Sequence, residues 1–225
     1  MKISLLSADL SSNCVGRAYI LARILQRRHT VEIVGPAFAG TIWEPLAEQR
    51  QVEFRIVPAY PVLHSIHRQF RAIRREITGD IIYATKPLLT SYGVGLAQRL
   101  RKECPVVLDI DDWETGLRKE TLSRLGGLSV VKSLGASALF LAQTSSYWNV
   151  HLMQTMTRFA DRITVSGSFL QRRYGGTIVW HASNTGELEP SKAARRWGRD
   201  RLGANDHHQL VMFLGPREMG GIVSM

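Results

Sequence analysis

Short apolar runs alternate with amphipathic segments along most of the chain. The apolar runs, rich in Val, Ile and Leu, predict strands over 2–7, 30–34, 52–57, 80–84, 106–110, 162–166 and 177–180. Between several of them, apolar residues recur at helical spacing and predict helices over 16–28, 63–77, 88–102 and 169–174. Strands that alternate with helices pair in parallel. The pattern therefore predicts an α/β fold, a Rossmann-like, doubly wound parallel sheet with helices on both faces.

The alternation of strands and helices is interrupted after the fifth predicted strand. A short helix over 117–124 is followed by an apolar segment rich in small residues over 128–144, and by a further helical segment over 147–160. Such a helical insert is longer than a simple crossover requires. Core packing is the common fate of apolar segments like 128–144, and we expect it here, with contact to a bilayer as the alternative. Lys132 interrupts the segment, which falls short of the ~20 residues that a spanning helix needs.

Composition narrows the classes of function. The chain has 225 residues, of which 44% are hydrophobic and 21% charged, as in globular proteins. A formal net charge of +10 favours anionic partners, although arginines scattered over a solvated surface give the same balance. The two cysteines, Cys14 and Cys104, have neither the spacing of metal ligands nor the number that a disulfide framework needs. The N-terminus lacks the apolar run of a signal peptide. We therefore expect a cytoplasmic protein.

The predicted helix over 63–77 is strongly amphipathic. Ile66, Phe70, Ile73 and Ile77 share a narrow face, and the arginines at 68, 71, 74 and 75 lie on the opposite side. An ordinary surface helix is the favoured interpretation. Peripheral contact with the cytoplasmic face of a membrane is the alternative, since basic amphipathic helices bind anionic lipid.

A cluster of acidic residues follows the fifth predicted strand. The sequence PVVLDIDDWETG places Asp111, Asp112 and Glu114 where this strand ends, with Trp113 between them. Ligands of open α/β sheets bind at the carboxyl ends of the strands, which makes these acids candidates for a site. Capping of the next helix by Asp112 and packing of Trp113 in the core are the plain alternatives.

Polar residues also follow the first and fourth predicted strands. Ser12, Asn13 and Gly16 form a turn before the first helix, and a turn of this kind presents backbone N–H groups to a ligand. It contains neither GxGxxG nor a Walker lysine, so a plain structural turn is an equal alternative. Lys86 follows the fourth strand and is a cation near the same edge of the sheet.

Several segments, in this order, resemble the retaining, nucleotide-sugar-dependent glycosyltransferases of family 4. They are GRAYILARILQRRHTVEIVGP from Gly16, DIIYATKPLLTS from Asp80, PVVLDIDDWE from Pro105, ADRITVSGSFLQRRYGG over 160–176, WHASNT over 180–185 and LVMFLGPRE over 210–218. That family has the GT-B fold, in which two Rossmann-like domains face each other across a cleft. The resemblance implies that this chain is the first half of such a fold.

The resemblance also implies a division of the chain. Residues 1–185 would form the acceptor-binding domain, residues 186–208 an interdomain linker with a basic helix over 191–202, and residues 209–225 the truncated start of the nucleotide-sugar-binding domain. A strand over 209–214 would begin that second domain. On this interpretation the chain is a fragment, a truncated product or one piece of a split enzyme, and is inactive by itself.

The implied activity is retaining transfer of a glycosyl group from a nucleotide-sugar to an acceptor hydroxyl, as in polysaccharide biosynthesis. Asp111 and Asp112 would be the catalytic residues. Acceptor-binding residues would be Ser12, Asn13, Gly16, Lys86 and Trp113, and donor-phosphate contacts would come from Gly215 and Arg217. No cofactor and no metal would be needed. The partners would be a nucleotide-sugar, a glycan, lipid or small-molecule acceptor, and a separately encoded donor-domain chain.

Two other classes of function remain open from the residues. One is a non-catalytic Rossmann-like module that acts by binding a partner or a membrane. The other is a nucleic-acid binder, which only the net charge favours, because the chain has no recognised motif and no interleaving of aromatic and basic residues.

Overall fold

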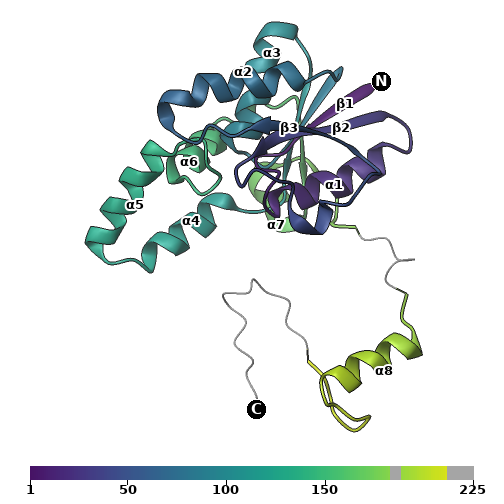
Figure 1. The fold of residues 1–225 in the computed structure, drawn as a ribbon. Coiled ribbons are helices and arrows are strands. Elements are labelled where there is room, and N and C mark those ends of the chain that lie inside the picture. Colours follow the sequence, from purple (N-terminus) through teal and green to yellow (C-terminus); the bar gives the residue numbers. More distant parts are fainter. Residues whose placement is uncertain (183–188, 212–225) are drawn as a thin grey trace. The chain divides into compact units, whose positions relative to one another are not determined.

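The computed structural model describes residues 1–182 and 189–211. The chain is divided into two compact units, Met1–Ala182 and Ser183–Met225. In its described part the first unit contains a seven-stranded parallel sheet of order β3-β2-β1-β4-β5-β6-β7 (Figure 1). The strands are β1 (Lys2–Leu6), β2 (Thr30–Ala37), β3 (Glu53–Pro58), β4 (Ile81–Thr85), β5 (Val106–Ile110), β6 (Arg162–Val165) and β7 (Thr177–Ile178). The predicted α/β, Rossmann-like doubly wound sheet is confirmed.

Helices connect these parallel strands and cover both faces of the sheet. The α-helices of the first unit are α1 (Cys14–Leu25), α2 (Ile66–Glu76), α3 (Val94–Lys102), α4 (Glu114–Ser123), α5 (Gly127–Leu139), α6 (Tyr147–Thr155) and α7 (Ser168–Tyr174). Short turns of 3-10 helix lie at Glu44–Leu46, Leu63–Ser65 and Thr157–Phe159, and a π-helical turn, η3, spans Leu89–Gly93. The amphipathic segment over 63–77 accordingly forms a 3-10 turn followed by α2.

Successive side chains along a strand point to opposite faces of the sheet, and each face has its own hydrophobic core. Along β1, Leu5 packs with Ala18 and Leu21 of α1, whereas Leu6 packs with Ile73 of α2 and Val94 of α3. This alternation places one helical layer on each face of the sheet. The strand order reverses between β1 and β4, where the chain leaves one half of the sheet and starts the other. Such a reversal opens a crevice at the carboxyl ends of the two strands.

The insert between β5 and β6 contains α4, α5 and α6, of which α4 and α5 extend away from the sheet in Figure 1. α5 packs against α6, and none of the residues of this fully described helix is buried. The prediction that the apolar segment 128–144 packs in the core is therefore wrong for α5. Apolar composition decided that prediction, but burial depends on which surface the connections bring against the helix.

Several boundaries also differ from the sequence prediction. β2 continues through Gly35 and Pro36 to Ala37 because β3 pairs with it along that stretch. A Cβ atom at Gly35 would lie 2.5 Å from the Ser7 carbonyl oxygen, so only glycine allows this close approach. α1 begins at Cys14 rather than Gly16, and α4 already begins at Glu114.

The second unit contains α8 (Lys192–Arg201), which matches the predicted basic helix. Ser191 caps it by accepting a hydrogen bond from the Ala194 N–H at 2.9 Å. Residues 209–211 have no regular structure, and the rest of the predicted strand over 209–214 lies outside the described residues. The division at residues 185 and 208 stays a prediction. No helix in the described ranges is long and apolar enough to cross a membrane.

Candidate functional site

A polar pocket of about 320 Å³ lies at the carboxyl ends of β1, β4 and β5. It therefore occupies the crevice where the strand order reverses. Loops that follow these three strands supply most of its wall, and α1, α4 and the segment between α5 and α6 complete it. The lining residues are Ser12, Asn13, Cys14, Lys86, Leu88, Asp111, Asp112, Glu114, Leu117, Arg118 and Thr144.

Lys86 directs its side chain into this pocket from an unusual backbone conformation. Its φ of +66° lies in the left-handed region, which costs a non-glycine residue about 1 kcal/mol or more. Two hydrogen bonds hold the turn: the Lys86 N–H donates to the Asp109 carbonyl at 2.8 Å, and the Ser91 hydroxyl donates to the Lys86 carbonyl at 2.9 Å. The turn thereby carries a buried cation at the end of β4.

Three carboxylates surround the Lys86 ammonium group. Lys86 Nζ donates to Asp112 Oδ2 and to Glu114 Oε1, and it lies 3.0 Å from Asp111 Oδ1. Burial lowers the pKa of this ammonium group, but the negative charges of Asp111, Glu114 and Asp112 outweigh burial and hold its pKa above the ordinary value. Lys86 therefore stays charged over the whole physiological range.

Asp111 and Asp112 differ in their surroundings. The Asp111 side chain is only 10% exposed, whereas that of Asp112 is 50% exposed. Burial raises the pKa of Asp111 above its ordinary value, despite the opposing attraction of Lys86. The Ser166 hydroxyl donates to the Asp111 carbonyl at 2.8 Å and fixes the backbone that carries this side chain. Asp111 therefore keeps its proton to a higher pH than an ordinary aspartate does.

Three buried polar atoms on the pocket wall have unused hydrogen-bonding capacity. Ser12 Oγ, Asp111 Oδ1 and Arg118 Nε make no regular hydrogen bond within the described part of the chain. The Cys14 thiol is a weak partner of Ser12, and Asp111 Oδ1 lies 3.0 Å from Lys86 Nζ in an ion pair that leaves the oxygen a further lone pair. Buried polar groups are nearly always paired in native proteins, so these atoms call for partners from outside the chain.

Cys14 is the other chemically reactive group of the wall. Burial raises the pKa of its thiol above the ordinary value, and the nearby Lys86 does not compensate for this effect. The thiol therefore stays protonated at neutral pH and is a poor nucleophile.

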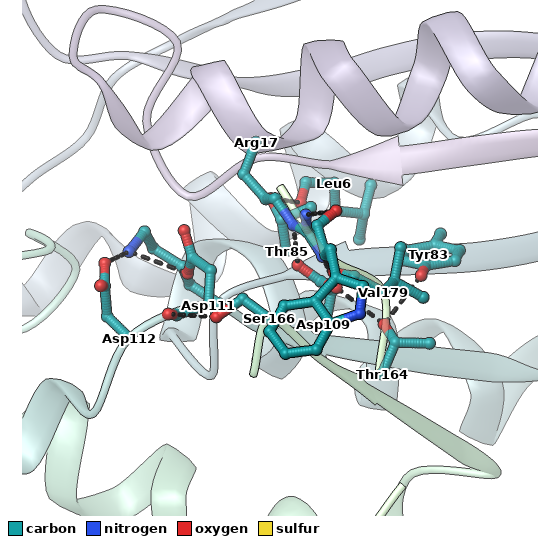
Figure 2. Close-up of polar contacts among 12 residues, drawn as sticks. Leu6, Arg17, Tyr83, Thr85, Asp109, Asp111, Asp112, Thr164, Ser166 and Val179 are labelled. Carbon is teal, nitrogen blue, oxygen red and sulfur yellow. Dashed lines mark hydrogen bonds and ion pairs between the residues drawn. The ribbon is translucent and has the colours of Figure 1, made fainter. Parts of the chain in front are cut away.

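Behind the pocket, Arg17 and Asp109 form a buried ion pair that Figure 2 shows beside Asp111. Arg17 donates through Nε and Nη2 to the two carboxylate oxygens of Asp109, each at 3.0 Å. It also donates to the carbonyls of Val179 and Trp180, which follow β7. Net charge and composition gave Arg17 no role, and arginine is rarely buried without a partner. The structure buries it, because Asp109 lies opposite on β5.

Thr164 and Tyr83 extend this buried network across the sheet. The Thr164 hydroxyl donates to Asp109 Oδ1 at 2.7 Å and lies 2.8 Å from the Tyr83 hydroxyl (Figure 2). Burial and the negative charge of Asp109 raise the pKa of Tyr83 to about 12. Every member of the network has a polar partner, which is the condition for burying such groups without a large penalty.

The structure brings five of the predicted site residues together on the pocket wall: Ser12, Asn13, Lys86, Asp111 and Asp112. Gly16 and Trp113 are not among the lining residues. The Trp113 ring packs on the core, with Phe169 at 6.0 Å between ring centroids and the Arg173 guanidinium 4.4 Å from the ring. Trp113 also takes the cap position of α4, so Asp112 does not cap that helix. Gly215 and Arg217 lie outside the described residues.

Sequence reasoning did not assign Arg118 or Cys14 to the site, and it named Glu114 as a candidate acid without giving it a role. Glu114 belongs to the same acidic stretch as Asp111 and Asp112, and its place in the first turn of α4 was the available signal. Arg118 lies one helical turn after Glu114, so both can face the same pocket. Within the described residues, no group of His, Cys, Asp and Glu is arranged to hold a metal ion.

Comparison of the chain with known proteins shows little similarity in sequence or structure. No family model matches the chain, and no curated protein matches it. Among solved structures, the chain is similar to a short-chain dehydrogenase/reductase (wide type) from Veillonella parvula DSM 2008 in complex with NADP. That likeness has 11% identity and a TM-score of 0.39, and covers 73% of this chain and 67% of the other. A likeness of this extent does not define a function for the chain.

These findings contradict the assignment that the sequence motifs had indicated. No glycosyltransferase model or curated relative matches, and the solved structure named above is a short-chain dehydrogenase/reductase. The family 4 assignment and its sugar-transfer activity are therefore wrong, and the non-catalytic module offered beside them gains no support. The expectation of no cofactor is not upheld either, and the similar structure was solved with NADP. The motifs misled because short strand-and-turn segments recur across doubly wound folds.

Proposed function

We propose that the first unit, Met1–Ala182, binds a small, hydroxyl-rich molecule in the pocket at the carboxyl ends of β1, β4 and β5. One observation carries this proposal: Ser12 Oγ, Asp111 Oδ1 and Arg118 Nε are buried without a regular hydrogen bond in the described structure, and all three residues line that pocket. A buried polar group without a partner costs about 1–3 kcal/mol. A ligand that pairs with all three atoms recovers much of that free energy.

The chemistry of these atoms defines the groups that the ligand presents. Asp111 Oδ1 accepts a hydrogen bond, Arg118 Nε donates one, and the Ser12 hydroxyl does both. A hydroxyl group is the simplest partner for such a mixed set because it donates and accepts at once. Neighbouring hydroxyls on one carbon skeleton would meet several of these atoms together.

The charges around the pocket argue against a phosphate ligand, in spite of the net charge of the chain. Asp111, Asp112 and Glu114 contribute three carboxylates, and the Lys86 ammonium group is already engaged by them. Arg118 is the other cation of the wall. An incoming dianion would meet this acidic cluster at close range, where like charges repel strongly. A neutral or cationic ligand avoids that repulsion.

Asp111 also gives the pocket a group that exchanges protons. Its raised pKa favours the neutral acid more than an ordinary aspartate does, and it lies beside the permanently charged Lys86. A carboxyl with these properties acts as a general acid or base toward a bound hydroxyl. We include proton exchange at Asp111 in the proposed function.

A thermal-shift panel tests the ligand class. The full chain is heated with glucose, galactose or myo-inositol at millimolar concentration, and in parallel with inorganic phosphate or NADP. The proposal predicts that at least one neutral, hydroxyl-rich probe raises the melting temperature through preferential binding to the folded state. Stabilisation by phosphate or NADP alone would contradict it.

Two neighbouring serines provide a matched pair of variants. Ser12→Ala removes a hydroxyl without a regular partner, so the free energy of unfolding should stay the same or rise, while affinity for the stabilising probe falls about tenfold. Ser11→Ala removes a hydroxyl that donates to the Thr41 carbonyl and accepts from the Ala39 N–H. It should lower stability by about 1 kcal/mol and leave affinity unchanged. The opposite pattern, measured by urea unfolding and calorimetric titration, would contradict the role of Ser12.

A further inference from the structure

The apolar helix α5 lies outside the core. Its residues are hydrophobic on average, yet none of them is buried in the described structure. Leu128 is 70% exposed, Val131 66% and Leu139 52%. Isolated exposed leucines are normal on protein surfaces, but a continuous row of them marks an interaction surface.

These exposed residues form one stripe along the helix. Leu128, Val131, Gly135 and Leu139 follow one another at intervals of three or four residues, which places them on one face. We call this face the α5 stripe. The third of its four positions is glycine, so the aliphatic side chains of the stripe lie toward both ends of the helix.

Basic residues accompany the α5 stripe. Between Leu117 and Trp148 the insert contains four basic residues and one acidic residue, a net charge of +3: Arg118, Lys119, Arg124 and Lys132 against Glu120. Lys119 and Lys132 are exposed, and Arg124 pairs with Glu120 on the surface of α4. Lys132 lies within α5 itself, four residues after Leu128.

An aromatic side chain joins α6 to this helix. Trp148 is 44% exposed, and its indole N–H donates to the Leu134 carbonyl of α5 at 3.1 Å. Tyr147 packs against it edge to face, with 5.2 Å between ring centroids. Half-exposed tryptophan and tyrosine, with an apolar ring and a polar edge, suit the boundary between water and lipid.

We propose that the α5 stripe docks on the surface of an anionic lipid bilayer, with α5 lying in the plane of the interface. This inference concerns a different surface from the pocket and goes beyond the proposed function. α5 is thirteen residues long and does not span a bilayer. Apolar burial and attraction between basic side chains and anionic headgroups together drive such binding. A second copy of the chain fits this face less well, because two inserts that each carry a net charge of +3 repel each other.

Vesicle sedimentation with the full chain tests the proposal. Vesicles of phosphatidylglycerol and phosphatidylcholine are compared with vesicles of phosphatidylcholine alone. We expect the chain to sediment with the anionic vesicles and to remain in solution with the neutral ones. The double variant Leu128→Gln, Val131→Gln should bind the anionic vesicles about tenfold more weakly, because it removes apolar contact without changing the charge.

The matched control is the double variant Leu63→Gln, Leu100→Gln. These leucines are 48% and 87% exposed and belong to other elements, the turn before α2 and α3. Because all four leucine and valine side chains are exposed, both double variants should fold. Equal binding of the two variants would overturn the proposal and attribute binding to net charge alone. Absence of vesicle binding, or a dimer that only the α5 stripe variant dissociates, would overturn it as well.

Discussion

At the scale of single residues, Lys86 determines the character of the pocket. Its side chain is 8% exposed, and three carboxylates lie within hydrogen-bonding or ion-pairing distance of its ammonium group. Burying a charge is tolerated only where opposite charges and hydrogen bonds compensate for lost hydration. The left-handed backbone at this position is consistent with such a compensated site, since strain of this kind persists only where neighbours enforce it.

Replacing Lys86 by methionine should destabilise the protein by about 3 kcal/mol. The change leaves Asp111, Asp112 and Glu114 close together without their shared cation, and breaking a buried ion pair costs about 3–5 kcal/mol before the partial exposure of Asp112 is considered. Urea unfolding measures the loss. The control is Lys119→Met on the exposed side of α4, which should change stability by no more than about 0.5 kcal/mol. Equal losses in both variants would contradict this account of Lys86.

Replacing Asp111 by asparagine should change the pH dependence of stability. Burial raises the folded-state pKa of Asp111, so its favourable contribution is fully present below the ordinary aspartate pKa and is lost as pH rises through the folded-state value. Asparagine does not titrate. The stability of the Asp111→Asn variant minus that of the original chain should therefore increase from pH of about 3.5 to about 7. A difference that stays constant or decreases with rising pH would show that burial does not dominate the pKa of Asp111.

Single residues also show where sequence reasoning succeeds and where it stops. Asp111 and Asp112 could be assigned to a site because they follow a recognisable buried strand in a parallel sheet. Lys86 could be placed near the same edge, but nothing in the sequence gives its left-handed backbone. The pair of Arg17 and Asp109 spans 92 positions of the chain, so only the folded sheet brings it together. The sequence allowed Trp113 to be either a site residue or a core residue, and its packing against Phe169 and Arg173 fits a core residue.

At the scale of elements, the Arg17 guanidinium connects α1, β5 and the chain after β7. It bonds both oxygens of Asp109 and the carbonyls of Val179 and Trp180. β7 has only two residues, and few ladder hydrogen bonds can hold so short a strand. The arginine therefore supplies part of the attachment that the strand itself lacks.

Replacing Arg17 by methionine should lower the free energy of unfolding by about 3–5 kcal/mol. It leaves Asp109 charged and buried, with Thr164 as a remaining hydrogen-bond donor. The control is Arg27→Met, an exposed arginine just after the same helix, with an expected change of no more than about 0.5 kcal/mol. The double variant Arg17→Met, Asp109→Asn should recover part of the loss. Strictly additive effects would contradict a direct interaction between the two side chains.

The strands were predictable from sequence in a way that the insert was not. A strand buried on both faces requires apolar residues at nearly every position, which leaves a clear signal in segments such as 106–110. The apolar residues of α5 carry the same local signal as a core helix. Whether such residues are buried depends on how α4, α5 and α6 pack, and that is a property of tertiary structure.

At the scale of the whole molecule, the first unit contains all that its fold requires. The seven strands and the three hydrophobic core clusters all lie within Met1–Ala182. The doubly wound sheet follows from the alternation of strands and helices. The function did not follow from it, because this architecture serves many unrelated activities and the site decides among them.

A pair of truncations tests the independence of this unit. Residues 1–182 should melt within about 2 °C of the full chain, because the sheet and its cores are complete. Residues 1–176 lack β7 and the carbonyls of Val179 and Trp180 that Arg17 binds, and should melt at least about 4 °C lower. Calorimetry of the two fragments measures both values. A large loss in the longer fragment would show that residues after 182 stabilise the sheet.

The central claim is that Ser12 Oγ, Asp111 Oδ1 and Arg118 Nε are ligand contacts. A crystal structure of the full chain with the most stabilising hydroxyl-rich probe tests this claim most directly. The account predicts that hydroxyl oxygens of the probe lie within hydrogen-bonding distance of Asp111 Oδ1 and of at least one of Ser12 Oγ and Arg118 Nε. A probe bound elsewhere on the molecule, with only water at these three atoms, would contradict it.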